Sequence, residues 1–187
     1  MTHALVTGAS GFIGGHVVRA LLADGVRVRA FVRPKAEAPT LTGLEIERVE
    51  GDVTDTDAVR SAMAGIDVVF HLAARYALHR RDSKLTNAVN VAGTQTIMEA
   101  ALAASVDRIV HTSSVAAIGH SVANGSLADE SVWADPNNTP GPYEASKYAS
   151  ERLVQRMVAE QGLPAIAVNP SAPIGPLDFK PTPTGQL

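Results

Sequence analysis

The strand, turn and helix expected at the N-terminus constrain the fold of this chain more than any other segment. An apolar run at residues 3–7 leads into a turn with glycines at Gly8, Gly11 and Gly14, and a helical pattern then continues to residue 23. In a strand–turn–helix unit of this kind, Gly8 permits a tight turn. Gly11 lets the backbone approach a pyrophosphate, and Gly14 lets the helix pack closely on the sheet.

The turn therefore predicts a dinucleotide site, in which free amide groups at the helix N-terminus bind the pyrophosphate. Ser10, Phe12 and Ile13 lie within the same turn and are expected to contact the ligand. The glycines are three residues apart at both gaps, unlike the simplest dinucleotide fingerprint. A glycine-rich turn without a ligand is the alternative.

Short apolar runs alternate with longer helical patterns along the rest of the chain. The expected strands span residues 3–7, 26–32, 45–49, 66–71, 108–111 and 165–169, and the expected helices span 11–23, 56–64, 84–104 and 143–160. The strands are too uniformly apolar to have one wet face, which predicts a parallel sheet covered on both sides. The alternation predicts an α/β chain with a doubly wound parallel sheet, the Rossmann fold, over residues 1–176.

Composition excludes several classes of protein. The net charge of −3 provides no basic field for nucleic acid. The absence of cysteine excludes disulfides and thiolate metal sites and fits a reducing, cytoplasmic setting. The six histidines show no metal-ligand spacing, so no metal is expected. No apolar stretch approaches the roughly 20 residues that span a bilayer.

Two positions bear on the choice of dinucleotide. Where NAD-binding folds carry an acid at the end of the second strand, this chain has Arg33 and, two residues later, Lys35. A guanidinium suits a 2′-phosphate, which favours NADP over NAD, although Arg33 as a solvated strand-end residue is the alternative. Asp52 and Val53 follow the third strand and are placed to meet the adenine; an acid that caps the next helix is the alternative for Asp52.

A tyrosine and a lysine four residues apart, Tyr143 and Lys147, lie on one face of an expected helix. A free tyrosine has a pKa of about 10, and a nearby ammonium favours the phenolate. Lowering the pKa to near neutrality requires about 4 kcal/mol, which a close cation and a positively charged cofactor ring can supply. Upstream, Thr112, Ser113 and Ser114 end an apolar strand, where a hydroxyl faces the ligand crevice and can position a reacting oxygen. The set predicts proton transfer coupled to hydride transfer.

These motifs, in this order, resemble the extended short-chain dehydrogenases/reductases. More narrowly, the chain resembles the NAD-dependent epimerase/dehydratase group, including dihydroflavonol-4-reductase-like proteins, and its residues 168–185 look most like hopanoid-associated sugar epimerases. The resemblance rests on the glycine turn and on the segments 52–53, 71–74, 90–94, 112–114, 143–147 and 168–176.

The resemblance implies roles for individual residues. Ser114 is the catalytic serine, Tyr143 the acid/base, and Lys147 binds the nicotinamide ribose and lowers the tyrosine pKa. Asn90 falls at the asparagine of the central helix that helps to organise the site; a helix-bending polar residue is the alternative. Arg33 matches the arginine of NADP-preferring reductases. The residues expected to line the cofactor further include Leu72, Ala73, Ala74, Thr112, Pro170 and Ser171.

The implied reaction is hydride transfer at a secondary alcohol or ketone of a sugar-nucleotide or dihydroflavonol-like substrate. A cofactor-binding or sensing module, or an inactive fragment, is the alternative. The resemblance also implies a smaller C-terminal substrate domain, of which residues 177–187 are expected to begin the linker and which this chain lacks. A homodimer through helices 84–104 and 143–160 is expected.

Three features each have a structural and a functional interpretation, and the sequence leaves the choice between them open. His71 ends a strand, where a structural or cofactor-lining group is favoured and a base is the alternative. The basic run at residues 79–81 either forms a solvated loop or steers an anionic substrate. Trp133 either lines a pocket or pins its loop.

Overall fold

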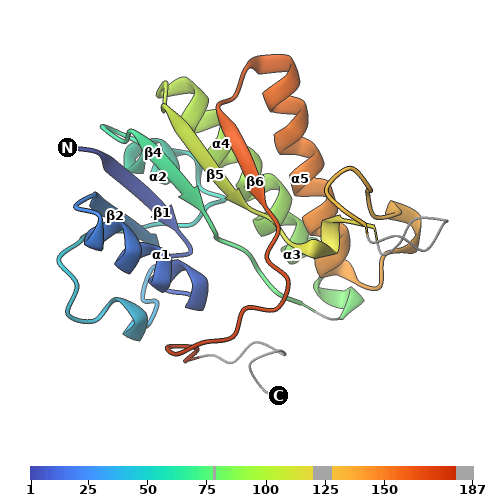
Figure 1. Cartoon of the computed structure of the whole chain (residues 1–187), viewed down its shortest axis with the longest axis horizontal. Coiled ribbons are helices and arrows are strands. Elements are labelled where there is room, and N and C mark those ends of the chain that lie inside the picture. Colours follow the sequence, from blue (N-terminus) through green and yellow to red (C-terminus); the bar gives the residue numbers. More distant parts are fainter. Residues whose placement is uncertain (78, 120–127, 180–187) are drawn as a thin grey trace.

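Six parallel strands form one sheet in the order β3-β2-β1-β4-β5-β6 (Figure 1). The computed structural model describes residues 1–77, 79–119 and 128–179. The strands are β1 (His3–Thr7), β2 (Arg27–Val32), β3 (Glu47–Glu50), β4 (Val68–His71), β5 (Arg108–Thr112) and β6 (Ala165–Val168). The helices are α1 (Phe12–Ala23), α2 (Thr56–Ala62), α3 (Ser83–Asn87), α4 (Gly93–Ala103) and α5 (Pro142–Gln161). The expected doubly wound Rossmann sheet is thus confirmed.

The strand order reverses between β1 and β4, which pair in parallel with Thr7 opposite His71. One half of the sheet runs outward through β2 and β3, and the other runs through β5 and β6. A crevice forms outside the carboxyl ends of the strands at such a switch point, and ligands bind there in doubly wound folds. The topology therefore places the glycine turn after β1 at the centre of this edge.

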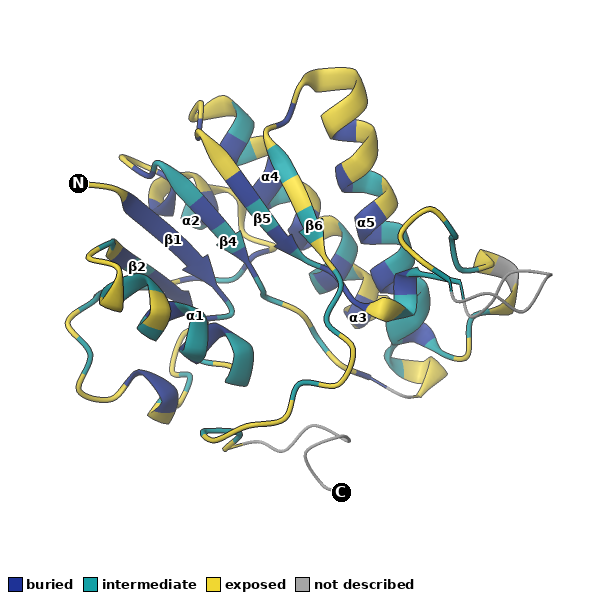
Figure 2. Cartoon of the chain, viewed as in Figure 1, coloured by how far each residue is buried: buried dark blue, intermediate teal, exposed yellow. Residues whose placement is uncertain are grey.

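Two apolar clusters hold helices against opposite faces of the sheet (Figures 1 and 2). On β1, Leu5 and Val6 are both fully buried but belong to different clusters, because successive strand side chains point to opposite faces. Val18 joins α1 to the Val6 face, whereas Ile97 of α4 and Val154 of α5 join the Leu5 face. Alternation along the central strand therefore sorts the helices onto the two faces.

The expectation that every strand is covered on both sides is wrong at β6. Ile166 and Val168 are 55% and 39% exposed, and Figure 2 shows this edge strand partly in the exposed colour. Within the described residues α1 lies over β1 and β2, while α4 and α5 lie on the opposite face from it (Figure 1). The apolar sequence of β6 shows that both of its faces could be buried. The described residues leave Ile166 and Val168 partly exposed.

The helix expected over residues 84–104 is divided by a change in backbone geometry. Ser83–Asn87 and Gly93–Ala103 are α-helical, but a π-helical turn occupies Ala88–Ala92 between them. Such turns are rare and often occur at functional sites. Here the turn contains Asn90, which is buried.

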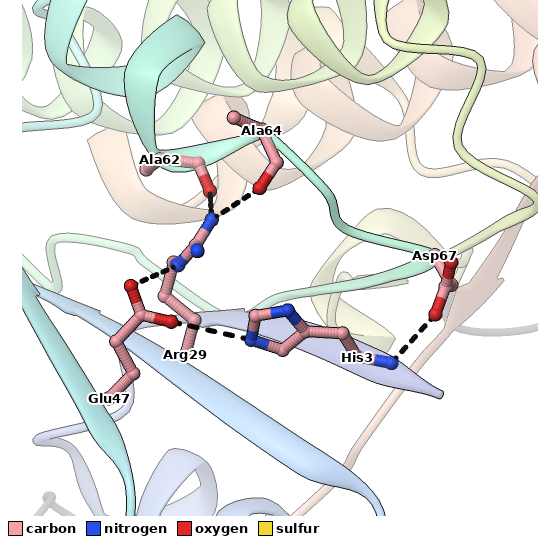
Figure 3. A network of polar contacts seen from close by, with 6 residues as sticks. All are labelled: His3, Arg29, Glu47, Ala62, Ala64 and Asp67. Carbon is pink, nitrogen blue, oxygen red and sulfur yellow. Dashed lines mark hydrogen bonds and ion pairs between the residues drawn. The ribbon is translucent and has the colours of Figure 1, made fainter. Parts of the chain in front are cut away.

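A polar network lies at the amino ends of the strands (Figure 3). Arg29 of β2 pairs through Nε with Glu47 of β3 at 2.9 Å and donates from one terminal nitrogen to the carbonyls of Ala62 and Ala64 after α2. His3 lies 3.5 Å from the other Glu47 oxygen. The network ties edge strand β3 and the end of α2 to the sheet on the side away from the crevice.

The structure describes only the beginning of the expected linker. Residues 177–179 of the expected linker are described, and residues 180–187 lie outside the described residues. None of the helices described is both long and apolar enough to cross a bilayer.

Candidate active site

Two adjoining cavities open at the carboxyl edge of the sheet, with volumes of about 450 Å³ and about 260 Å³. Gly8, Gly11, Leu72 and Ala74 line both of them. Every residue predicted for the site lines one or both cavities, with the exception of Asn90. The larger cavity adds Ser10, Arg33, Asp52, Val53 and Ala73, and the smaller adds Phe12, Ile13, Gly14, Thr112, Ser114, Tyr143, Lys147, Pro170 and Ser171.

The glycine turn has no room for side chains at two of its positions. Gly8 has a positive φ of 69°, and a Cβ there would lie 2.7 Å from the backbone nitrogen of Ala73. A Cβ on Gly14 would overlap the carbonyl oxygen of Gly8, so helix α1 lies directly against the turn. Gly11 is the N-cap of α1 and has no side chain to cap the first amides. These amides therefore remain available to an anionic group such as a pyrophosphate, which is what a dinucleotide requires.

The two positions that bear on nucleotide choice line the larger cavity and not the smaller one. Arg33 is exposed at the end of β2 and lines this cavity. Asp52 accepts hydrogen bonds at Oδ1 from the backbone nitrogen and the hydroxyl of Thr54, at 2.9 and 2.7 Å. The cap of α2 is Asp55, which accepts from the amides of Asp57 and Ala58. The helix-cap alternative for Asp52 is therefore wrong.

Tyr143 and Ser114 both line the smaller cavity. Tyr143 stands in the first turn of α5, and the Tyr76 ring packs against it with centroids 4.6 Å apart. Ser114 is buried after β5 and accepts a 3.2 Å hydrogen bond from the amide of Ala116. Burial raises the pKa of Tyr143, with smaller contributions in the same direction from Tyr76 and Glu144, while the Ser114 hydrogen bond lowers it.

Lys147 is buried on α5, one turn after Tyr143, and Nζ donates a 2.8 Å hydrogen bond to the carbonyl oxygen of Thr112. Burial lowers the pKa of Lys147 to about 8, and the negative charge of Glu151 opposes that shift. The protein residues alone do not lower the pKa of Tyr143, because burial outweighs the hydrogen bond from Ser114. Lys147 directs a donor at a strand carbonyl instead.

Asn90 occupies the π-helical turn behind the cavities. Its side-chain amide accepts from the backbone nitrogen of Arg75 at 2.7 Å and donates to the carbonyl of Arg75 at 3.0 Å. The same amide donates to Ser146 Oγ at 2.8 Å, and Ser146 donates to the carbonyl of Tyr143. Asn90 therefore positions the segment after β4 and the first turn of α5, and it lines neither cavity.

His71 and His111 form a buried stacked pair behind the site, with ring centroids 5.5 Å apart. His71 Nδ1 lies 2.7 Å from Thr7 Oγ1, and Nε2 lies 2.9 Å from Thr94 Oγ1. Burial lowers the pKa of His71 to about 3 and that of His111 well below its usual value, so both rings are neutral at pH 7. The structural interpretation of His71 is the one that the geometry supports.

Sequence analysis missed a buried carboxylate, Glu151, two turns after Tyr143 on α5. Its Oε2 accepts hydrogen bonds from Ser113 Oγ and from Asn169 Nδ2, the latter at 2.8 Å. Glu151 is 3% exposed. The signal was present in the spacing, because Tyr143, Lys147 and Glu151 follow one another at intervals of four and share one helix face.

The two remaining open features lie away from the cavities. Arg80 and Arg81 are exposed in a short 3₁₀ turn, and neither lines a cavity. The Trp133 ring packs edge-on against Tyr148, and the Arg152 guanidinium lies 4.8 Å from its centroid. Trp133 thus pins its loop to α5 rather than lining either cavity.

A family model described as the NAD dependent epimerase/dehydratase family matches residues 4–187. Among curated proteins, the chain is 43% identical over 182 residues to a putative dihydroflavonol 4-reductase of Synechocystis sp., covering 97% of this chain and 52% of that protein. It is 41% identical over 183 residues to sterol demethylase protein B of Methylococcus capsulatus, covering 97% of this chain and 55% of that protein. The chain thus spans about half the length of these relatives.

Among solved structures, the chain is similar to a Thermus thermophilus UDP-glucose 4-epimerase in complex with NAD. The two share 28% sequence identity with a TM-score of 0.77, over 90% of this chain and 54% of the epimerase.

Proposed function

The chain belongs to the NAD-dependent epimerase/dehydratase family, and we propose that it binds a nicotinamide dinucleotide and transfers hydride at a secondary alcohol or ketone. The observation that carries the proposal is that Ser114, Tyr143 and Lys147 line one cavity, which adjoins the glycine turn. Proton-transferring groups beside a dinucleotide cradle are what hydride transfer to a carbonyl requires.

The dinucleotide would lie along the two cavities, with its pyrophosphate at the start of α1 and its nicotinamide between the glycine turn and Tyr143. When bound, it supplies or accepts the hydride. Gly11 provides the uncapped helix start, and Leu72 and Ala74 line both cavities. Pro170 and Ser171 close the far side of the smaller cavity and would flank the nicotinamide.

The proton is held on Tyr143 Oη. Because burial raises the pKa of Tyr143, the phenol is protonated at neutral pH and can donate to the oxygen of a ketone as that oxygen gains negative charge. Ser114, which lines the same cavity as Tyr143, would orient the reacting oxygen. Lys147 uses one of its three N–H donors in the hydrogen bond to the Thr112 carbonyl, and the other two could bind the nicotinamide ribose.

Two similar proteins support a proposal for the substrate class. One curated relative is named a putative dihydroflavonol 4-reductase, and one similar solved structure is a UDP-glucose 4-epimerase. Both names denote a reaction at a ring carbon that carries oxygen. We propose a sugar-nucleotide or dihydroflavonol-like alcohol or ketone for this protein. Net consumption of NADPH identifies a reductase, whereas regeneration of the cofactor in each cycle identifies an epimerase.

NADP is the proposed cofactor, on the strength of one exposed residue. Arg33 lines the larger cavity at the end of β2, where a guanidinium can bind a 2′-phosphate with two parallel hydrogen bonds.

We also propose that residues 1–176 form the cofactor-binding domain, that the following residues begin a linker, and that the protein is a homodimer. Helices α4 and α5 pack side by side on one face of the sheet, and the same pair from a second copy would complete a four-helix bundle. Light scattering coupled to size exclusion gives the mass that tests this assembly.

The reaction is tested with Tyr143→Phe, assayed by NADPH oxidation against dihydroflavonols and UDP-4-ketosugars. Removing the phenolic proton lowers turnover by about 10²- to 10⁴-fold. Tyr148→Phe, on the same helix but packed against Trp133, is the matched control and retains turnover. Unaltered turnover in Tyr143→Phe contradicts the mechanism. Cofactor binding with no turnover on any of these substrates instead favours a binding module.

A further inference from the structure

A buried carboxylate, Glu151, lies at the meeting point of three chain segments that border the smaller cavity. Its Oε2 accepts from Ser113 Oγ at the end of β5 and from Asn169 Nδ2 at the end of β6. The same Asn169 nitrogen donates to the carbonyl oxygen of Ser114 at 3.0 Å. One carboxylate oxygen on α5 thus fixes the two strand ends relative to the helix that carries Tyr143.

The two strand ends border the reacting groups directly. Ser113 precedes Ser114, and Asn169 precedes Pro170, and both Ser114 and Pro170 line the smaller cavity. The backbones are also joined, because the Ser113 nitrogen donates to the Val168 carbonyl at 2.8 Å. A shift of the carboxylate would therefore move both walls of the cavity together.

The charge of the carboxylate also acts on the ammonium of Lys147, which lies four residues earlier on α5. Both side chains are buried, at 3% and 4% exposure, and they lie one helical turn apart on α5. A buried ammonium is costly unless an opposite charge compensates it. The groups that face Lys147 from β4 and β5 are His71 and His111, which are neutral at pH 7 because burial lowers their pKa values. The opposing charge that acts on the pKa of Lys147 is that of Glu151, which raises it.

We propose that Glu151 is a positioning residue, whose carboxylate holds the ends of β5 and β6 at the nicotinamide side of the site and balances the ammonium of Lys147. The proposal rests on the proposed function, since it assigns Glu151 to the site that would carry out hydride transfer. A carboxylate kept only for packing would fix the strand ends without affecting Lys147. The two roles therefore separate in experiment.

The first test is the titration of Lys147, followed by NMR of ¹³C-lysine-labelled protein without cofactor. The Lys147 resonance is identified by its absence in Lys147→Arg. In Glu151→Gln, which removes the charge at constant size, the titration midpoint of Lys147 falls by about one pH unit or more. Glu160→Gln removes the same charge from an exposed position of α5 about 20 Å along the helix axis, and it leaves the midpoint unchanged.

The second test is the binding of NADPH and NADH, followed by dihydronicotinamide fluorescence. Asn169→Ala weakens binding by about tenfold, because it breaks the tie between α5 and the end of β6. Glu151→Gln weakens binding less, because its amide oxygen still accepts from Ser113 and Asn169 but carries no charge. In Asn169→Ala the carboxylate keeps its charge, so the Lys147 midpoint stays at that of the parent protein. An unchanged Lys147 midpoint in folded Glu151→Gln overturns the counter-charge role, and parent-like binding by both variants overturns the positioning role.

If Glu151→Gln does not fold, Asn169→Ala and Ser113→Ala decide the positioning role, because each removes one hydrogen bond to the carboxylate. Parent-like binding in both overturns that role. The counter-charge role is then measured in Glu151→Met, which also removes the charge at similar length and for which the Lys147 midpoint is expected to fall by about one pH unit; an unchanged midpoint overturns it. Neither readout needs turnover, so a failed Tyr143→Phe test contradicts the proposed reaction without altering these results.

Discussion

Lys147, buried in α5, donates a 2.8 Å hydrogen bond from Nζ to the backbone carbonyl of Thr112 at the end of β5. The bond joins the helix that carries Tyr143 to the strand that leads to Ser114. It also holds an ammonium where burial lowers its pKa from 10.5 to about 8. Folding thus disfavours the charged form of Lys147. The free energy of unfolding therefore depends on the titration of this lysine.

The first prediction concerns Lys147→Met. Between pH 8 and pH 10.5 the unfolded chain binds a proton at this lysine that the folded protein has released, so stability rises with pH across this window. Full titration corresponds to about 3 kcal/mol. Replacing Lys147 with methionine removes this rise. Urea unfolding of both proteins from pH 7 to pH 10.5 measures it; Lys84→Met, which changes a lysine in α3, is the control, and an equal rise in the Lys147 variant contradicts the prediction.

The second prediction contrasts two stacked histidines. His71 bonds to Thr7 and Thr94, whereas both ring nitrogens of His111 are buried without a hydrogen-bond partner in the described part of the chain. His71→Phe therefore destabilises the protein by about 2 kcal/mol, because the buried hydroxyls of Thr7 and Thr94 each lose one hydrogen bond. His111→Phe keeps the ring and leaves stability equal or higher. Chemical denaturation at pH 7 ranks the two, and the opposite ranking contradicts the structure.

The same pair predicts sensitivity to acid. The folded pKa of His71 is about 3 against 6.5 for the free side chain, so the unfolded chain takes up a proton first. Stability is fully present above pH 6.5 and is lost as pH falls below it, through about pH 3. His111→Phe removes one such group and reduces the slope of stability against pH between 6.5 and 4. An exposed histidine, His79, provides the control variant His79→Asn.

The third prediction concerns the glycine turn. A Cβ at position 14 would overlap the Gly8 carbonyl, so Gly14→Ala pushes α1 away from the turn, costs about 3 kcal/mol of stability and weakens NADPH binding. Gly43→Ala meets no atom within 4 Å and costs about 1 kcal/mol, for its positive φ alone. Thermal unfolding and NADPH titration compare the two. Equal effects in both variants would show that the turn is not tightly packed.

The fourth prediction tests the choice of cofactor. Arg33→Ala lowers NADPH affinity by about tenfold or more, because a charge-assisted pair with the 2′-phosphate is lost. The affinity for NADH stays the same, since NADH has no such phosphate. Arg27→Ala, an exposed arginine at the other end of β2, changes neither affinity. Tighter binding of NADH than NADPH by the parent protein contradicts the NADP assignment.

Much of the fold and the site was predictable because local rules govern them. Alternating apolar runs and helical patterns predicted the strands and helices, and β1 has the expected bounds, His3–Thr7. The spacing between Tyr143 and Lys147 placed both on one helix face, and the structure places both in one cavity. The sequence did not predict the roles that depend on contacts between distant segments of the chain. The role of Asn90 depends on Arg75 and Ser146, which lie 15 and 56 residues away along the chain.

The sequence by itself determined the order of the strands and helices, the glycine turn and the helix face that Tyr143 and Lys147 share, because propensity, glycine geometry and i, i+4 spacing act over a few residues. Tertiary structure alone decided the protonation of the site and the groups that hold it in place. Burial raises the pKa of Tyr143, where sequence reasoning expected Lys147 to lower it. The partners of Glu151, Ser113 and Asn169, meet it only when β5, β6 and α5 pack together, because desolvation and long-range hydrogen bonds exist only in the folded protein.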